Sequence, residues 1–174
     1  MRTRSRAAAL FAAATTSIFS ALAAPPPNAA AFGGDLVPRP DTSFPLPTAP
    51  QYGDGLGADR GHEGQDLFAP AGTPELAVAD AFVLEAAAGD NGGRGNYVSI
   101  YDPVADRTYN YFHMISSPLV APGDRVRAGQ ELGRLGCSGS CWGDHLHFEA
   151  RSGRDPYGPV LDPLPILQRL QRGG

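Results

Sequence analysis

Short stretches of alternating hydrophobic and polar residues dominate the middle of this chain. Over residues 96–101 the apolar Val98 and Ile100 fall on one face, as in a half-buried β-strand. An Asp-Pro pair then signals a turn, and the aromatic-rich stretch 108–114 follows as a candidate return strand. The pattern predicts an antiparallel β-hairpin.

Three further stretches complete the predicted fold. Residues 76–88 are apolar and alternate poorly, which indicates two short buried strands bent near Asp80. Residues 145–150 alternate well and predict another strand. Asp162 and Pro163 suit the N-cap and first position of a short C-terminal helix. Its apolar face would carry three leucines, Leu164, Leu167 and Leu170. Because 22 glycines and 17 prolines among 174 residues disfavour long helices, we predict one mainly β domain.

The first 24 residues have the features of a secretory signal peptide. Three arginines precede an alanine-rich apolar run that ends in the small-x-small sequence Ala21-Leu22-Ala23. An uncleaved membrane anchor is the alternative, but threonines and serines interrupt the run, and alanine contributes little to insertion. We expect residues 1–24 to be removed and the mature chain to be exported, without a stable membrane anchor. It would be secreted, or would reside in the periplasm or at the cell wall.

Composition separates residues 25–50 from residues 51–174. The first segment holds eight of the 17 prolines and few large apolar residues, so it is predicted to be a linker or N-terminal extension. We place a single domain at residues 51–174 and expect a monomer. The formal net charge is -4, and no basic patch with interleaved aromatic residues is present, which argues against nucleic acid as a partner.

The sequence DHLHFE carries the densest candidate chemistry. On a strand, His145, His147 and Glu149 would share one face, while Leu146 and Phe148 would anchor the other face in a core. Two imidazoles side by side can form a metal site or a proton-transfer site. An H-x-H pair also arises by chance, and alternation alone does not say which histidine would be a ligand. Glu149 could serve as a general base or in an outer, structural role.

His62 and Asp66 lie four residues apart in the sequence GHEGQD, which suits a loop that runs into a strand. Imidazole and carboxylate are both good ligands for zinc, although a surface loop with a simple hydrogen bond is the alternative. Together with one histidine of the H-x-H pair they would supply three protein ligands. Three ligands plus a water molecule is the pattern of a catalytic zinc site. His113 lies among aromatic residues, as core histidines do, but beside a metal it would be free to act on substrate.

Cys137 and Cys141 allow two interpretations. With His145 and His147 they could form a four-ligand structural zinc site, but thiols of an exported chain tend to oxidise, which favours a disulfide. So short a closed loop would stabilise the fold by only about 2 kcal/mol. Its expected use is to stiffen the turn that aims His145. Trp142, between the second cysteine and the histidines, could stack on substrate or simply pack.

Five sequence elements, in their order and spacing, resemble the LytM/lysostaphin family of zinc endopeptidases, which cut peptide cross-links in bacterial cell walls. The resemblance covers residues 52–167, nearly the whole predicted domain. The elements are H-x-G-x-D at 62–66, A-P-x-G-T-P at 69–74, G-G-x-G-N-Y-V at 92–98, G-D-x-V-x-x-G-Q-x-L-G at 123–133 and H-L-H-F-E at 145–149.

The resemblance implies that His62, Asp66 and His147 bind one zinc ion per chain, and that His113 and His145 position and activate water. It also implies an antiparallel β-sheet core of the duplicated hybrid motif (barrel-sandwich hybrid) type, with a groove at one edge of the sheet. The implied substrate is a peptide, in the cross-links or stem peptides of bacterial peptidoglycan. A cell-wall-binding or regulatory module of the same fold, with little or no turnover, is the alternative function.

Two stretches depart from the family pattern. The sequence GCSGSCWG at residues 136–143, which contains both cysteines, replaces a polar Gly-Asn-Thr-Gly turn. In addition, Ala81 follows Asp80 where glycine is usual. The first departure alters a wall of the expected groove. The sequence therefore leaves open which peptide bond is cut.

Overall fold

The computed structural model describes residues 42–58 and 61–173. It confirms the predicted fold class, because the described chain consists mainly of antiparallel β-strands and ends in one short helix. The strands are β1 (Gln51–Tyr52), β2 (Gln65–Phe68), β3 (Pro74–Leu76), β4 (Ala81–Ala87), β5 (Asn96–Asp102), β6 (Arg107–Met114), β7 (Arg125–Val126), β8 (Glu131–Arg134), β9 (His145–Ser152) and β10 (Val160–Leu161). The helices are the 3-10 turn η1 (Asn91–Gly93) and α1 (Pro163–Gly173).

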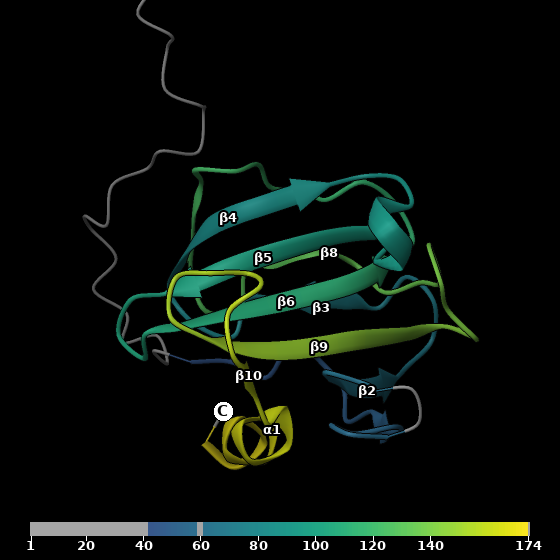
Figure 1. The fold of residues 1–174 in the computed structure, drawn as a ribbon, viewed down its shortest axis with the longest axis horizontal. Coiled ribbons are helices and arrows are strands. Elements are labelled where there is room, and N and C mark those ends of the chain that lie inside the picture. The colour runs from purple at the N-terminus through teal and green to yellow at the C-terminus, as the bar shows by residue number, and fades with distance from the viewer. Residues whose placement is uncertain (1–41, 59–60, 174) are drawn as a thin grey trace, which may run out of the picture.

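Within the described ranges the strands form two antiparallel sheets. The larger sheet has the order β1-β2-β9-β6-β5-β4-β7, with β10 added alongside β9, and β3 pairs with β8 in the smaller sheet. The smaller sheet lies behind the larger one in Figure 1. The predicted hairpin is confirmed as β5 and β6, and residues 76–88 do contain the end of β3 and all of β4.

The core lies between the two sheets, on the far side of the larger sheet in Figure 1. Alternation along β9 puts Leu146 and Phe148 there, and neither side chain has any exposed area. Their partners on β6 and β2 include Tyr111 and Leu67, which are equally buried. The opposite face of β9 is therefore left for the polar residues of the DHLHFE sequence, as the alternation predicted.

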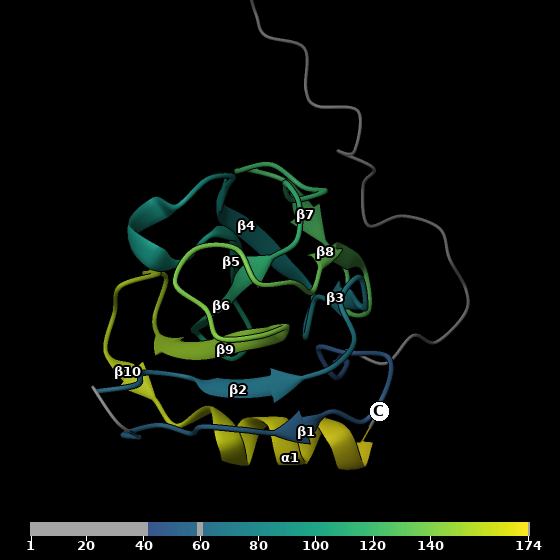
Figure 2. The same ribbon diagram turned by 90° about the vertical axis from the view of Figure 1, so that its right-hand side faces the viewer.

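Helix α1 begins as the sequence predicted. The Asp162 carboxylate accepts a hydrogen bond from the Leu164 backbone N–H at 3.0 Å, which satisfies one free donor of the first turn. Leu167 and Leu170 are buried as expected, together with Ile166, whereas Leu164 is only partly buried. Figure 2 shows the helix beneath β1 and β2, so that it covers this end of the larger sheet.

Residues 42–50 pack against the domain, although the sequence analysis placed them in the linker. The Leu46 side chain is only 3% exposed and belongs to the core. Backbone hydrogen bonds join Ser43 to Val78 and Leu76 to Pro45. The packed unit therefore includes these residues, while the predicted signal peptide and residues 25–41 lie outside the described part of the chain. Within the described ranges, no helix combines the length and apolar character needed to cross a membrane.

Candidate metal centre

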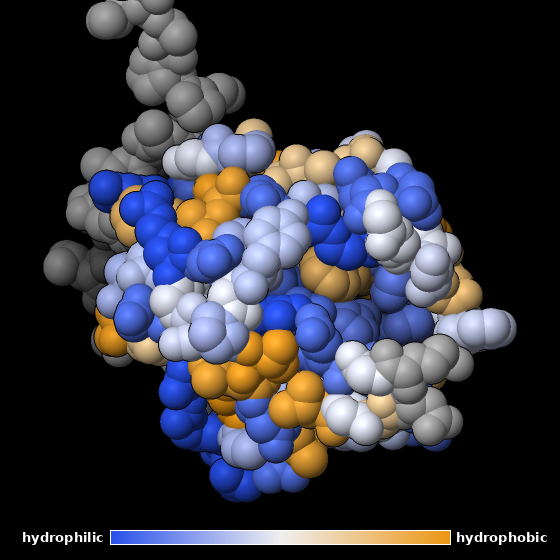
Figure 3. All heavy atoms as spheres, viewed as in Figure 1, coloured by the Kyte–Doolittle hydropathy of each residue, from blue (hydrophilic) through white to orange (hydrophobic). Residues whose placement is uncertain are grey.

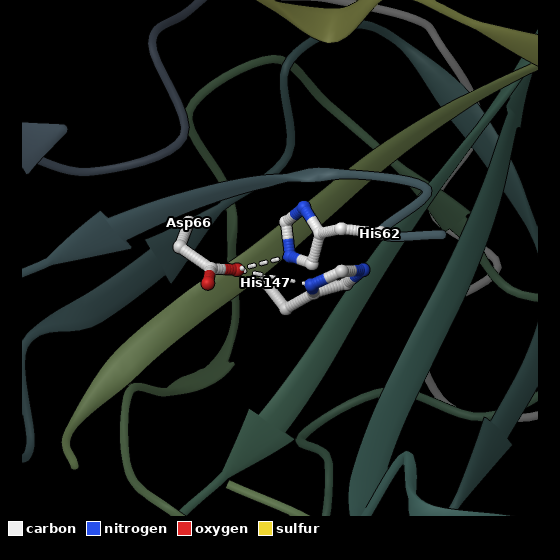
Figure 4. A group of neighbouring side chains, drawn as sticks. All are labelled: His62, Asp66 and His147. Carbon is white, nitrogen blue, oxygen red and sulfur yellow. Dashed lines mark hydrogen bonds and ion pairs between the residues drawn. The ribbon is translucent and has the colours of Figure 1, made fainter. Parts of the chain in front are cut away.

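The pairing of β2 with β9 brings Asp66 and His147 together. The two residues are direct cross-strand partners, so their side chains leave the sheet on the same face. One Asp66 carboxylate oxygen (Oδ1) lies 3.0 Å from His147 Nδ1 and 3.0 Å from Nε2 of His62, which comes from the loop before β2. The three ligand atoms lie within 4.8 Å of one another, and Figure 4 shows the three side chains converging. The structure thus joins all three residues expected to bind zinc.

The outer nitrogen of each of these two histidines has an acceptor of its own. His62 Nδ1 donates to the Gly55 carbonyl at 3.0 Å, and His147 Nε2 donates to Glu149 Oε1 at 3.3 Å. In this structure the inner nitrogens hydrogen-bond to Asp66 Oδ1; a metal ion that replaced those protons would receive the inner lone pairs, while the outer nitrogens stayed protonated. Histidine ligands of metals are oriented in this way. Two imidazoles and a carboxylate form a donor set that suits zinc.

Glu149 belongs to a buried polar network behind His147. It accepts hydrogen bonds from Asn110 Nδ2 at 2.7 Å and from Arg151 Nε at 3.0 Å. Burial alone would raise the pKa of the Glu149 carboxyl, but its bonds to His147, Asn110 and Arg151 lower that pKa below its ordinary value. An anionic Glu149 at this position orients His147, and the outer role left open by the sequence is the one that its contacts favour.

The local charge favours a cation between these strands. Burial by itself would lower the pKa of His147, but hydrogen bonds to Asp66 and Glu149 raise it to about 9. Asp66 also loses solvent by burial, yet the three nearby histidines lower the pKa of its carboxyl. A proton is held here by two carboxylates, and a divalent ion would experience the same attraction.

The surroundings of Gly64 explain why the H-x-G-x-D element has a glycine at this position. A Cβ at this position would lie 2.6 Å from His147 Nε2 and 2.8 Å from the Phe148 carbonyl oxygen. Neither neighbour can move without disturbing the strand pairing or the histidine. Only glycine lets the His62 loop pass this close to β9.

His113 reaches the site through a β-bulge that alternation could not foresee. Tyr111 faces the core, and strict alternation would turn His113 to the core as well. Instead the β5–β6 register shifts between Asn96 and Val98, and His113 adopts a positive φ of 68°. Its ring consequently lies on the site face, with its centroid 5.0 Å from that of His145.

The two histidines outside the ligand group hydrogen-bond to backbone carbonyls. His113 Nδ1 donates to the Ser138 carbonyl at 2.8 Å, and His145 Nδ1 donates to the Gly143 carbonyl at 2.7 Å. His145 Nε2 lies 3.6 Å from Asp66 Oδ1, beside the ligand group. Burial lowers the pKa of His113 to about 4, so this imidazole is neutral near pH 7.

A groove opens beside this cluster. It has a volume of about 390 Å³ and is lined by Gly53, Asp54, Asp66, Phe68, Trp142 and His145. Trp142 is 87% exposed at its rim, so this residue is not a core residue. Figure 3 shows mainly hydrophilic atoms over β6 and β9, whereas apolar atoms gather over β10 and α1.

Cys137 is paired with Cys141 in a disulfide, with their Cα atoms 5.4 Å apart. Both sulfur atoms are used in this bond, which is the arrangement that the sequence analysis favoured over a four-ligand zinc site. The sequence did not predict what this loop supplies. Its backbone carbonyls carry no side-chain signature, so their contacts with the histidines could not be found from residue types.

The two-sheet antiparallel fold places a His-Asp-His cluster that could hold a metal ion beside an open groove. The chain belongs to Peptidase family M23, whose profile matches residues 60–159. This finding confirms the LytM/lysostaphin resemblance seen in the sequence.

Individual relatives agree with this assignment. The glycyl-glycine endopeptidase ALE-1 of Staphylococcus capitis is 36% identical over 126 residues, which cover 70% of this chain and 34% of ALE-1. The chain therefore spans about a third of the length of that relative. The catalytic domain of lysostaphin from Staphylococcus simulans superposes with a TM-score of 0.60 at 31% identity, covering 68% of this chain and 92% of that domain. A zinc-containing peptidase from Vibrio cholerae superposes with a TM-score of 0.59 at 26% identity, covering 71% of this chain and 39% of that one.

Proposed function

We propose that this protein is an exported zinc-dependent endopeptidase that hydrolyses peptide bonds of bacterial peptidoglycan. Its zinc ligands are His62, Asp66 and His147, and its proton-transfer residues are His113 and His145. The observation that carries this proposal is the convergence of three ligand atoms within 4.8 Å beside a groove that His145 also lines. Membership of a family of peptidases and the glycyl-glycine endopeptidase activity named for ALE-1 support the same conclusion.

The residues present suit a single zinc ion with an open coordination position. Three protein ligands leave room for water or substrate, whereas a structural site would have four. A zinc ion held there would polarise the scissile carbonyl and lower the pKa of a water molecule toward 7. With a metal bound, the outer hydrogen bonds of His62 and His147 would hold both rings in the tautomer that a metal requires.

His113 and His145 are arranged for proton transfer. Each donates its Nδ1 proton to a backbone carbonyl, so Nε2 is the nitrogen of each ring that is left for exchanging a proton. One of them accepts the proton of the attacking water, and either can stabilise the oxyanion and protonate the leaving amine. The low pKa of His113, about 4, keeps this ring unprotonated at neutral pH.

The substrate is a peptide bound in the groove beside Trp142. Glycyl bridges and the cross-links between stem peptides are the two candidate sites of cleavage. Mass spectrometry of the fragments released from purified peptidoglycan distinguishes them, because the new termini identify the bond. Metal analysis of the same preparation should find close to one zinc per chain. Zinc binding without any release of fragments from cell walls or peptides would contradict the proposal and favour a binding module.

A further inference from the structure

One short loop contacts both histidines that are not proposed as zinc ligands. The acceptor for His113 Nδ1 is the carbonyl of Ser138, and the acceptor for His145 Nδ1 is the carbonyl of Gly143. Both carbonyls belong to the loop of residues 137–143, of which the Cys137–Cys141 disulfide closes residues 137–141. This segment is called the disulfide loop below.

The proposed zinc ligands take their support from other parts of the chain. His62 donates to the Gly55 carbonyl, and His147 donates to the Glu149 carboxylate on its own strand. Asp66 is fixed by the pairing of β2 with β9. None of these contacts involves the disulfide loop. The site thus has two separate sets of supports, one for the ligands and one for the other histidines.

Several contacts fix the disulfide loop itself. The Gly143 N–H donates to Cys137 Sγ at 3.2 Å, so the disulfide touches the residue whose carbonyl holds His145. The Ser138 hydroxyl donates to the Met114 carbonyl at 2.7 Å and accepts from the Asn96 N–H at 2.8 Å. These last two hydrogen bonds attach the loop to the β-bulge that directs His113 into the site.

The loop also fits closely against its neighbours. Gly139 has a positive φ of 72°, and a Cβ at this position would overlap the backbone of Gly95. The loop consequently has little room to shift while the disulfide is intact. A displacement of either carbonyl would move a histidine ring or change which ring nitrogen carries its proton.

We propose that the disulfide loop is a positioning element for proton transfer, which fixes His113 and His145 through the carbonyls of Ser138 and Gly143 without supporting the zinc ligands. The expected effect on catalysis rests on the proposed function. The expected effect on the orientation and tautomer of the two imidazoles does not, because it can be observed without any turnover.

The test uses the full chain with Cys137→Ala and Cys141→Ala combined. Alanine is preferred because free thiols could bind zinc themselves. The zinc content should stay close to that of the wild type. Since a 1 Å misplacement of a catalytic group can cost about 100-fold, we expect kcat to fall by about 10- to 100-fold while KM changes much less. The ¹⁵N resonances of the His113 and His145 rings in the metal-free protein should shift, and those of His62 should not.

Trp142→Ala is the matched control, because Trp142 lies in the same loop, whereas the backbone carbonyls of Ser138 and Gly143, not its side chain, accept the Nδ1 protons of His113 and His145. It lines the groove, so its loss should raise KM and leave the tautomers of His113 and His145 unchanged. Because the double variant could fail to fold, the disulfide is also opened chemically in the folded wild-type protein. A water-soluble phosphine reduces the disulfide of the folded wild type, giving two thiols and a phosphine oxide whose oxygen comes from water. It should reproduce the resonance shifts.

Two results would overturn the inference. One is an opened loop with wild-type kcat and unchanged resonances of His113 and His145. The other is loss of zinc in parallel with activity, which would show that the loop supports the whole site. If the wild type hydrolyses no peptide, the proposed function fails, but the ring resonances of the metal-free protein still decide whether the loop positions these two histidines.

Discussion

The proposed ligand group and the proposed proton-transfer pair occupy one site, but the chain builds them differently. Asp66 and His147 are neighbours in a regular strand ladder, and His62 reaches them over Gly64 from an adjoining loop. His113 and His145 depend on a bulge and on the carbonyls of a disulfide-closed loop. A ladder gives nearly fixed positions to ligands that must share one ion. The closely fitted loop instead fixes the rings of the two other histidines through its backbone carbonyls.

Removing a ligand should have the largest effect. His147→Ala takes away one of three donors, so the protein should purify largely free of zinc and inactive. Asp66→Ala should behave in the same way. Metal analysis and a peptidoglycan hydrolysis assay on the same preparation check both properties. A His147→Ala variant that keeps zinc would show that the ligand group has been assigned wrongly.

Removing a proposed proton-transfer histidine should lower the rate without loss of zinc, unlike removing a proposed ligand. His145 lies on the same strand and face as His147, two residues away, so it provides a matched comparison. His145→Ala should keep close to one zinc per chain and lose roughly 100- to 10,000-fold in rate, the usual range for general acid–base groups. His113→Ala should behave alike. If His145→Ala instead loses its zinc while His147→Ala keeps it, the two roles are reversed.

Glu149→Gln tests the outer support of the ligand group. The amide keeps the size of the side chain but loses the negative charge that accepts the His147 Nε2 proton. Changes of this kind weaken metal binding by about 10- to 100-fold, which a competition titration with a chelating dye can measure. Glu63→Gln is the control, because Glu63 also pairs with Arg151 but is exposed and makes no hydrogen bond or ion pair with His147 among the described residues. Equal zinc affinities in the two variants would mean that Glu149 does not orient His147.

The same contrast explains what the sequence could predict. Strand alternation placed His145, His147 and Glu149 on one face, and glycine-flanked spacing placed His62 and Asp66 in a loop before a strand. Both predictions follow from local periodicity, and the structure confirms both placements. The roles of the individual histidines stay predictions that the proposed variants test.

What the sequence missed depends on backbone geometry. The bulge at His113 reverses the expected face of this residue, and no residue type signals it. The Ser138 and Gly143 carbonyls are chemically the same as any other peptide carbonyl. The packing of Leu46 into the core was missed because the prolines around it indicated a linker. Single residues of this kind are placed by tertiary contacts, which periodicity does not encode.

Glu75 should have the smallest effect on catalysis, because it lies in the smaller sheet, outside both groups. Its side chain is fully buried opposite Gly133, and neither carboxylate oxygen has a hydrogen-bond partner among the described residues. Burial raises the pKa of this carboxyl well above 4.5. Since the folded protein binds this proton more tightly than the unfolded chain does, the cost of keeping Glu75 buried grows as the pH rises above 4.5 toward the folded-state pKa. Glu75→Leu should therefore raise the free energy of unfolding by about 1–3 kcal/mol near neutral pH, and by less at pH 5. Denaturant unfolding at the two pH values measures this difference, while zinc content and kcat should stay at wild-type levels. A gain that is the same at both pH values, or a loss of stability, would show that the carboxyl is ionised and paired in the folded protein.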